Sequence, residues 1–425
     1  MQFEFERLIS LVGMVVLLGI AYLLSNNRKA INFRTVLFGI SLQLIFAVII
    51  LRTTPGRWLF DGARKAIARL LSFTDFGAGF LFGNLYKVTP EIVEEIGGPG
   101  PVQVIDGSSG NPVELGIIFA IHVLPTIIFF SSLMSVLYHL GVMQRLVEGF
   151  AWLMAKTMRT SGSESLSAAS NIFVGQTEAP LVVRPYVNTM TMSELMAIMT
   201  GGFATVAGGV MAAYVRFGID AGHLLAASVM SAPAALVMAK LMYPETEESK
   251  TAGHVKMNLE KTTANVIDAA AAGAADGLKL AANVGAMLLA FIALIAMINY
   301  GLGFFGLSLK QLLGYVFSPL AIVMGVPWQD ALNFGYLLGT KISINEFVAY
   351  VDLSSMKDSI TPRTFTIATY ALCGFANFSS IAIQIGGISS IAPGRRQDLS
   401  RLGLRAMLAG ALASWLTATI AGILI

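Results

Sequence analysis

Two stretches decide the fold: residues 174–181, VGQTEAPL, and residues 342–348, ISINEFV. Each places one glutamate, Glu178 or Glu346, in a short polar interruption of strongly apolar sequence. A charge at membrane depth is costly, and acidic residues found there usually belong to substrate or ion pathways. We therefore expect both carboxylates to be buried within a lipid bilayer and to line such a pathway.

The composition of the whole chain indicates a multi-span integral membrane protein. Of its 425 residues, 55% are hydrophobic and 12% are charged, whereas soluble domains carry about 25% charged residues. A soluble protein this apolar could not cover its surface with polar groups. The single cysteine, Cys373, excludes an intramolecular disulfide framework, and the histidines show no metal-ligand spacing.

Apolar segments of about 20 residues, the length that crosses a bilayer, predict eight transmembrane helices. They lie near residues 8–25, 35–51, 114–138, 192–215, 221–243, 272–300, 364–390 and 403–424. No small-residue cleavage site follows the first, so we expect a retained helix and not a signal peptide. The basic, amphipathic stretch 56–71 predicts an interfacial helix, and the Gly-, Pro- and acid-rich stretch 88–112 predicts an extramembrane loop.

Basic residues follow spans one, three and five and lie between spans seven and eight. These four loops share one side of an eight-span protein, and the positive-inside rule places that side in the cytoplasm. Both termini are then expected outside.

The two acidic stretches belong to an internal repeat. Gln311 follows Gln144 by 167 positions, Glu346 follows Glu178 by 168, and GFAT at 202–205 returns as GFAN 172 positions later. Each copy holds three spans, and an odd number of crossings inverts the second copy. Inverted repeats with broken helices are typical of secondary transporters, which hold substrate near the bilayer midplane.

This repeat divides the chain into four parts. We expect N-terminal scaffold helices with the interfacial helix and outer loop (1–112), a first repeat (113–243), a cytoplasmic linker (244–271) and a second repeat (272–425). The predicted fold class is an all-α membrane protein with eight transmembrane helices, two re-entrant helical hairpins and interfacial helices.

Each repeat contains two polar breaks. One is the tip of a re-entrant hairpin, at 175–178 and 343–346, and the other interrupts a span, at 201–209 and 373–380. Non-helical backbone survives at this depth only where protein buries it or where it lines a wet cavity. The carboxylates, amides and hydroxyls at these breaks suit a neutral ligand with hydroxyls and a heterocycle, because two acids would repel an anion.

The same residues have a purely structural interpretation. The two glutamates would then form ion pairs with basic neighbours, and the other polar side chains would cap helix ends or bond helix backbones. The residues concerned are Glu178 with Arg184, Glu346 with Lys341, Gln176 and Thr177 as caps, and Asn377 and Ser380 on backbone groups.

A coupling cation such as sodium requires oxygen ligands, and the carbonyls at half-helix ends can supply them. The first repeat offers Asn171, the carbonyl of Val174, Thr205 and the carbonyl of Val206, which flank its two breaks.

Three segments together resemble the signature segments of concentrative nucleoside transporters, and the bacterial, sodium-coupled branch fits best. They are GQTEAPL at 175–181, NEFVAY at 345–350 and GFANFSS at 374–380. The resemblance covers nearly the whole chain, from the interfacial helix onward.

The resemblance implies a homotrimer in the cell inner membrane. Spans one to three and six would form the scaffold, and the hairpins with the remaining spans would form a mobile transport domain. It implies nucleobase contacts from Gln176, Thr177, Glu178 and Val210, ribose contacts from Glu346, Asn377 and Ser380 with Phe375 beside the ligand, and a sodium site at Asn171, Val174, Thr205 and Val206.

We therefore expect a sodium–nucleoside symporter with Na+ as coupling ion, a substrate such as uridine, cytidine or adenosine, and elevator-like alternating access. A proton-coupled transporter that uses a titrating carboxylate such as Glu178 is the main alternative. No nucleophile, metal cluster or nucleotide motif supports an intramembrane enzyme that uses the two glutamates as acid and base. A passive channel would not need a closed site, and we expect no nucleic-acid partner.

Overall fold

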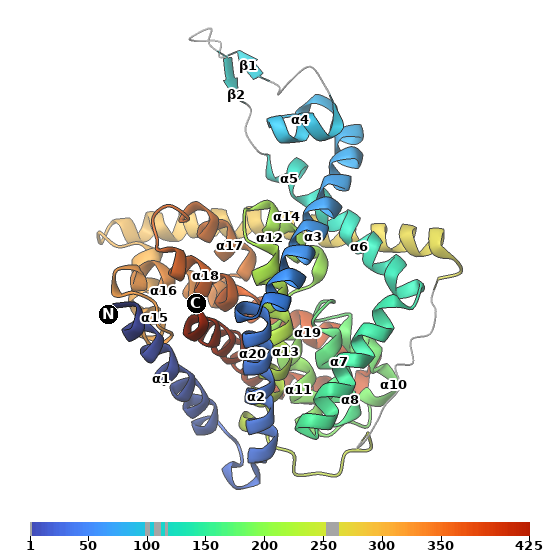
Figure 1. Cartoon of the computed structure of the whole chain (residues 1–425), viewed down its shortest axis with the longest axis vertical. Coiled ribbons are helices and arrows are strands. Elements are labelled where there is room, and N and C mark those ends of the chain that lie inside the picture. Colours follow the sequence, from blue (N-terminus) through green and yellow to red (C-terminus); the bar gives the residue numbers. More distant parts are fainter. Residues whose placement is uncertain (1, 98–102, 106–111, 115–117, 252–262) are drawn as a thin grey trace.

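A computed structural model describes residues 2–97, 103–105, 112–114, 118–251 and 263–425. Parts of the predicted outer loop and of the predicted linker lie outside these residues. The described structure is helical, as predicted, apart from one antiparallel pair of short strands (Figure 1).

The elements occur in three groups along the chain. The N-terminal group contains α1 (Gln2–Leu23), η1 (Arg28–Ala30), α2 (Phe33–Arg52), α3 (Thr54–Phe82), η2 (Gly83–Leu85), α4 (Pro90–Ile96), β1 (Gln103–Ile105) and β2 (Pro112–Glu114). The middle group contains α5 (Phe119–His122), α6 (Leu124–His139), α7 (Val142–Met158), α8 (Gly162–Ser170), α9 (Ala179–Val182), α10 (Arg184–Val187), α11 (Met192–Ala204), α12 (Gly208–Arg216) and α13 (Ala221–Met242). The C-terminal group contains α14 (Val266–Gly303), α15 (Leu309–Val323), η3 (Trp328–Asp330), α16 (Ala331–Ser343), α17 (Glu346–Ser355), α18 (Pro362–Leu372), α19 (Phe378–Ile391), η4 (Pro393–Arg395) and α20 (Arg396–Leu424).

Among the described residues, eight helices are long and apolar enough to cross a membrane, but they are not the predicted eight. Residues 54–85 join the set, whereas the predicted seventh span, 364–390, is divided into α18 and α19, which are each too short. The division falls within the predicted polar break 373–380. The break in the predicted fourth span also occurs, between α11 and α12.

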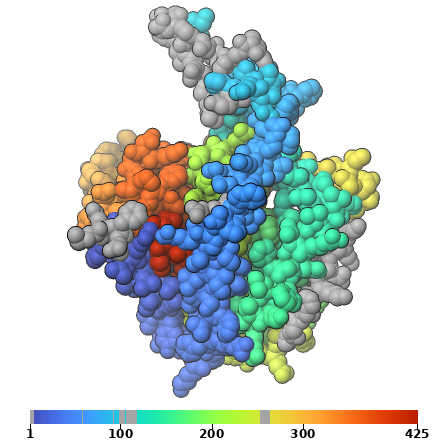
Figure 2. All heavy atoms as spheres, in the orientation of Figure 1, coloured from blue at the N-terminus to red at the C-terminus, as the bar shows by residue number. Residues whose placement is uncertain are grey.

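The predicted interfacial helix 56–71 is too short, because α3 contains 29 residues. Thr53 caps its start by accepting a hydrogen bond from Gly56 N at 3.0 Å, and the helix ends where Gly83 takes a φ of 57°. The stretch 88–112, predicted to be an extramembrane loop, contains α4, capped by Thr89, and β1 among its described residues. Figure 2 shows the end of α3 and α4 projecting beyond the body of the molecule.

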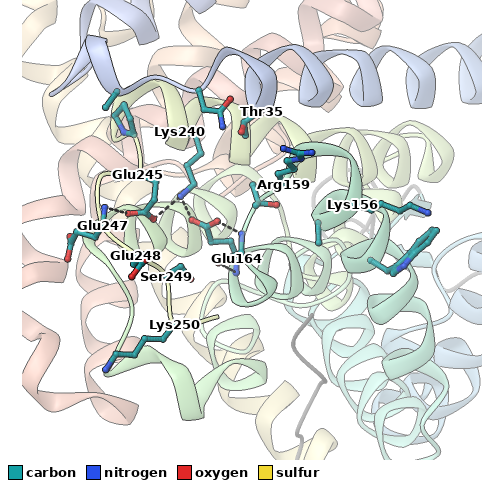
Figure 3. A pocket seen from close by; sticks show the side chains of 17 residues that line it. Thr35, Lys156, Arg159, Glu164, Lys240, Glu245, Glu247, Glu248, Ser249 and Lys250 are labelled. Carbon is teal, nitrogen blue, oxygen red and sulfur yellow. Dashed lines mark hydrogen bonds and ion pairs between the residues drawn. The ribbon is translucent and has the colours of Figure 1, made fainter. Parts of the chain in front are cut away.

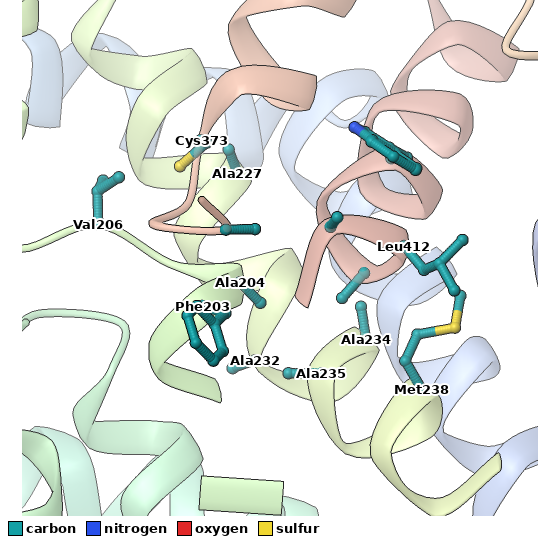
Figure 4. Packing of buried hydrophobic residues seen from close by; sticks show 14 of the residues in the cluster. Phe203, Ala204, Val206, Ala227, Ala232, Ala234, Ala235, Met238, Cys373 and Leu412 are labelled. Carbon is teal, nitrogen blue, oxygen red and sulfur yellow. The ribbon is translucent and has the colours of Figure 1, made fainter. Parts of the chain in front are cut away.

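The core is built by α11, α13 and α20, which pack closely on one another. Many of their buried residues are alanine or glycine, and small residues let helix backbones approach closely in membranes. Figure 4 shows Phe203 of α11 beside Ala232 of α13 in this core. The first two helices pack on its outside, where Gln43 of α2 donates to Thr417 of α20 at 2.8 Å.

A second helix pair is formed by α6 and α14. Ser132 of α6 donates a hydrogen bond to the carbonyl oxygen of Ala270 in α14 at 2.9 Å. In Figure 1, α14 runs across the view behind the other helices. Much of its surface is apolar and exposed on the single chain, as at Leu289 and Met297.

Replacing Gly410 by valine tests the close contact of α20 with α11. A β-carbon on Gly410 would lie 3.0 Å from the carbonyl carbon of Phe203 and 3.2 Å from the nitrogen of Ala204. Because backbone cannot yield as a side chain does, we expect a destabilisation of about 2 kcal/mol, measured as a lower melting temperature in detergent. Gly19→Ala is the control, since a β-carbon there meets nothing within 4 Å; equal melting temperatures for both variants would contradict this packing.

Candidate functional site

The break between α11 and α12 lies against the turn that precedes α9. Helix α11 ends at Ala204 and α12 begins at Gly208, whose backbone N–H donates to the carbonyl oxygen of Phe173 at 3.1 Å. The non-helical segments 171–178 and 205–207 therefore lie side by side.

The break between α18 and α19 lies against α11. Helix α18 ends at Leu372, and Asn377 caps α19 by accepting from Ser380 N at 2.9 Å. Between them, Gly374 has a φ of 137°, and a β-carbon there would lie 2.7 Å from the carbonyl oxygen of Phe203. Only glycine fits this position without strain, so the GFAN motif brings the two breaks together.

Glu346 is the first residue of α17 and is buried, with 5% of its surface exposed. Asn345 caps this helix by accepting from Val348 N at 2.9 Å. The two carboxylate oxygens of Glu346 accept from Tyr214 Oη at 3.0 Å and from Asn377 Nδ2 at 3.2 Å. One carboxylate thus joins α12, α17 and the second break.

Gln176 links the first polar turn to α19. Its Nε2 donates to Ser380 Oγ at 3.2 Å, and its Oε1 accepts from Gln384 Nε2 at 3.1 Å. Thr177 also lies against α19, since its Cγ2 would be 2.9 Å from a β-carbon on Gly387. Gln176, Ser380, Asn377 and Glu346 are therefore connected by hydrogen bonds. Together they form one continuous polar surface inside the protein, which extends from the turn before α9 to the start of α17.

Glu178 does not lie where the sequence analysis placed it, because its side chain is exposed on the single chain. Gln176, two residues earlier in the same turn, points inward to α19, whereas Glu178 folds back toward Gly175. Its carboxyl carbon lies 3.4 Å from where a β-carbon of Gly175 would be. Of the two glutamates expected to be buried, only Glu346 is.

The structure does not contain the two ion pairs that the structural alternative requires of the glutamates. The ion pairs within the described ranges join neither Glu178 to Arg184 nor Glu346 to Lys341. Lys341 instead donates to the carbonyl oxygen of Ala371 at 2.8 Å. Asn377 has a structural role, because its side-chain oxygen caps α19. It also belongs to the polar site, because its amide nitrogen donates a hydrogen bond to Glu346.

Residues that the sequence analysis assigned to a sodium site also lie close together. Asn171 is buried, and a β-carbon on Gly201 would lie 2.9 Å from its Nδ2. Thr205 Oγ1 donates to the carbonyl oxygen of the same Gly201 at 3.0 Å. Asn171 Oδ1 has no hydrogen-bond donor in the part of the chain that the structure describes. A buried oxygen without a donor fits a cation ligand, because leaving it unsatisfied would be costly.

The remaining predicted residues surround these groups. Val174 is half-buried in the first turn, and Val206 is buried in the unwound segment after Thr205. Val210 lies one helical turn before Tyr214 and so faces the same way on α12. Phe375 is half-buried within the second break.

Comparison with known proteins identifies the family. Models described as the N-terminus and C-terminus of Na+ dependent nucleoside transporters match residues 12–85 and 223–422, and a nucleoside-recognition "Gate" model matches residues 120–221. The chain is 47% identical to an uncharacterized transporter of Haemophilus influenzae, over 98% of this chain and 97% of that protein. This chain belongs to the Na+-dependent nucleoside transporter family.

Relatives with assigned names and relatives with solved structures support the same family assignment. Sodium/nucleoside cotransporter 1 of Mus musculus is 43% identical over 99% of this chain and 64% of its own length. An inward-facing, substrate-bound structure of CNTnw has a TM-score of 0.89 and 47% identity over 98% of both chains. An outward-facing CNTnw variant has a TM-score of 0.88 and 46% identity, over 98% of this chain and 97% of that chain. Inward- and outward-facing states of such similar transporters support alternating access, and the protein is a transporter and not an enzyme.

Sequence analysis of this transporter missed two residues of the polar surface. Gln384 donates both to Gln176 and to the carbonyl oxygen of Met199, the latter at 3.1 Å. Its signal was available, since Asn377, Ser380 and Gln384 recur at helical spacing in an otherwise apolar stretch. Tyr214 gave no such signal, because its contact with Glu346 joins residues 132 positions apart.

A separate cavity of about 1020 Å³ lies between the N-terminal end of α8 and the C-terminal end of α13. Lys240 pairs there with Glu164 and Glu245 (Figure 3). None of the predicted substrate or sodium residues lines it. The ion pair between Lys240 and Glu164 connects α13 to the start of α8.

Tyr214→Phe tests whether the tyrosine hydroxyl orients Glu346. The ring would keep its packing on Tyr350, 4.2 Å away between ring centroids, while the carboxylate loses one donor. We expect apparent nucleoside affinity to fall about tenfold, the effect of one hydrogen bond to a charged group, measured by calorimetry. Tyr350→Phe is the control because its hydroxyl donates to the carbonyl oxygen of Thr369 and not to Glu346; equal losses in the two variants would exclude a specific role for Tyr214.

Proposed function

We propose that this chain is a sodium–nucleoside symporter of the cell inner membrane. The observation that carries the proposal is the polar surface from Gln176 through Ser380 and Asn377 to Glu346, which joins the breaks of both repeats. Bacterial relatives of the same length favour the inner membrane.

In this proposal the nucleoside bridges the two repeats. Glu346 and Asn377, with Ser380, accept from and donate to the ribose hydroxyls, because a carboxylate can accept two hydroxyl donors. The amide of Gln176 and the hydroxyl of Thr177 bond the nucleobase edge, with Val210 and Phe375 as apolar neighbours. Glu178 reaches the base only if its exposed side chain turns inward when substrate binds.

Sodium is proposed as the second transported solute. Asn171, Thr205 and the carbonyls of Val174 and Val206 would hold it, and the donor-free Oδ1 of Asn171 supports this assignment. A cation between segments 171–178 and 205–207 would order the first polar turn, which carries Gln176. Sodium binding would therefore raise nucleoside affinity.

The remaining architecture is proposed from the family resemblance. The pairs α8–α9 and α16–α17 would be re-entrant hairpins of two inverted repeats, and a homotrimer would provide the fixed scaffold. The exposed apolar surface of α14 supports contact with lipid or another subunit. The hairpins with α11–α13 and α18–α20 would move across the bilayer as one transport domain.

Uptake by proteoliposomes tests the coupling. We expect uridine to accumulate against its gradient when an inward sodium gradient is present, and to stop when choline replaces sodium at fixed pH. Uptake driven equally well by a proton gradient in choline would favour the proton-coupled alternative. Equal uptake with and without either gradient would overturn active transport.

Glu346→Gln tests the ribose site. The amide keeps the size of the side chain but replaces one acceptor oxygen by a donor, so we expect uridine uptake to be abolished. Size-exclusion chromatography should show an unchanged assembly. Normal transport by a correctly assembled variant would remove Glu346 from the site.

Asn171→Ala tests the sodium site. Loss of one oxygen ligand should weaken apparent sodium affinity by about tenfold, while uridine affinity at saturating sodium changes less. Asn265→Ala, the same change at the exposed cap of α14, is the control. An unchanged sodium titration for Asn171→Ala would count against this ligand.

A further inference from the structure

Gln384 is a buried glutamine to which the proposed function gives no role. It lies one helical turn after Ser380 on α19, and none of its surface is exposed. Its Nε2 donates to two acceptors, the carbonyl oxygen of Met199 in α11 and Oε1 of Gln176, each at 3.1 Å. Its own Oε1 has no hydrogen-bond donor in the part of the chain that the structure describes. The contacts of this amide are therefore made by its nitrogen.

The carbonyl oxygen of Met199 fixes which way the Gln384 amide faces. A backbone carbonyl can only accept a hydrogen bond, so the group beside it must be the NH2 group of Gln384 and not its oxygen. With the amide reversed, two oxygens would face each other and a buried hydrogen bond would be lost, which is costly inside a protein. Because this carbonyl belongs to the backbone of α11, the fold sets the orientation before any ligand binds.

The orientation of Gln384 in turn fixes that of Gln176. Since the NH2 group of Gln384 donates, the atom of Gln176 that accepts must be its amide oxygen. The nitrogen of Gln176 then faces Ser380, whose Oγ accepts one of its two N–H groups at 3.2 Å. The hydrogen bonds of the described residues leave the second N–H without an acceptor, so it is available to a ligand.

Close packing on α11 keeps this arrangement in place. A β-carbon on Gly202 would lie 2.8 Å from Gln384 Nε2 and 2.9 Å from Gln176 Cβ. Both side chains therefore lie directly against the α11 backbone, and both are buried. A reversed Gln176 amide would place its NH2 group against that of Gln384, so that two donors would face each other.

We propose that Gln384 is a positioning residue for nucleobase recognition, which holds the Gln176 oxygen so that the Gln176 amide presents an N–H donor to the substrate. The inference rests on the base contact of Gln176 in the proposed function and adds the direction of that hydrogen bond. Gln176 then recognises an acceptor on the nucleobase, either a carbonyl oxygen or an unprotonated ring nitrogen. An N–H group of the base contributes nothing to this contact.

Analogues whose bases carry only an acceptor test this direction on the unaltered protein. The ribosides of 2-pyridone and 4-pyridone each keep one carbonyl oxygen of uridine and lack its ring N–H, whereas phenyl riboside lacks both groups. We expect at least one pyridone riboside to bind about fivefold tighter than phenyl riboside, the effect of one neutral hydrogen bond, measured by calorimetry at saturating sodium. Pyridone ribosides that bind no better than phenyl riboside would overturn the inference.

Substitution of Gln384 tests its positioning role. Gln384→Met keeps a side chain of similar length but cannot donate, so the Gln176 amide is free to reverse. We expect uridine affinity to fall about fivefold, while the affinity for phenyl riboside, whose ring offers no acceptor, stays the same. In a Gln176→Met background, Gln384→Met should have no further effect on uridine affinity, because the two residues act through one contact.

Gln43→Met is the matched control. Gln43 is also a fully buried glutamine, and its Nε2 donates to Thr417 at 2.8 Å between α2 and α20, so the ratio of uridine to phenyl riboside affinity should not change. An unchanged ratio in a folded Gln384→Met protein would overturn the inference. If that variant does not fold, Gln384→Glu replaces it, because a carboxyl group supplies at most one donor where the amide supplies two. Absence of uridine binding to the unaltered protein would instead remove the proposed function.

Discussion

The ends of α11 and α18 are buried within the protein, where they leave backbone carbonyls without helical partners and away from water. Such ends persist only when protein groups, water or ions satisfy them. Gly374 packs closely on the carbonyl oxygen of Phe203, which places the break after α18 against the end of α11. The amide of Asn171 and the hydroxyl of Thr205 lie at Gly201, near the break after α11. Each of these helix ends therefore needs a polar or cationic partner, and this requirement constrains how the neighbouring helices pack around them.

The side chains proposed to bind the nucleoside also connect helices to one another. Asn377 caps α19 and bonds Glu346, and Gln176 bonds both Ser380 and Gln384. A nucleoside that replaced some of these bonds would meet groups already oriented by the fold, which lowers the entropic cost of binding.

The ends of α11 and α18 meet different partners. Near the end of α11, Asn171 Oδ1 has no hydrogen-bond donor in the described part of the chain. At the end of α18, the buried ammonium of Lys341 donates to the carbonyl oxygen of Ala371. In the proposed function, sodium would bind beside the first of these two ends.

Composition and local pattern were enough to predict a helical membrane protein, the positions of both span breaks and the family resemblance, because hydrophobic length and glycine-rich polar interruptions are local properties. They did not give the full length of α3, the exposure of Glu178 or the hydrogen bond from Tyr214 to Glu346. Which side of a turn faces the interior depends on helices more than a hundred residues away. Tertiary packing alone decided that Gln176 points inward while Glu178 points outward, because α19 offers two hydrogen-bond partners to the side chain of Gln176.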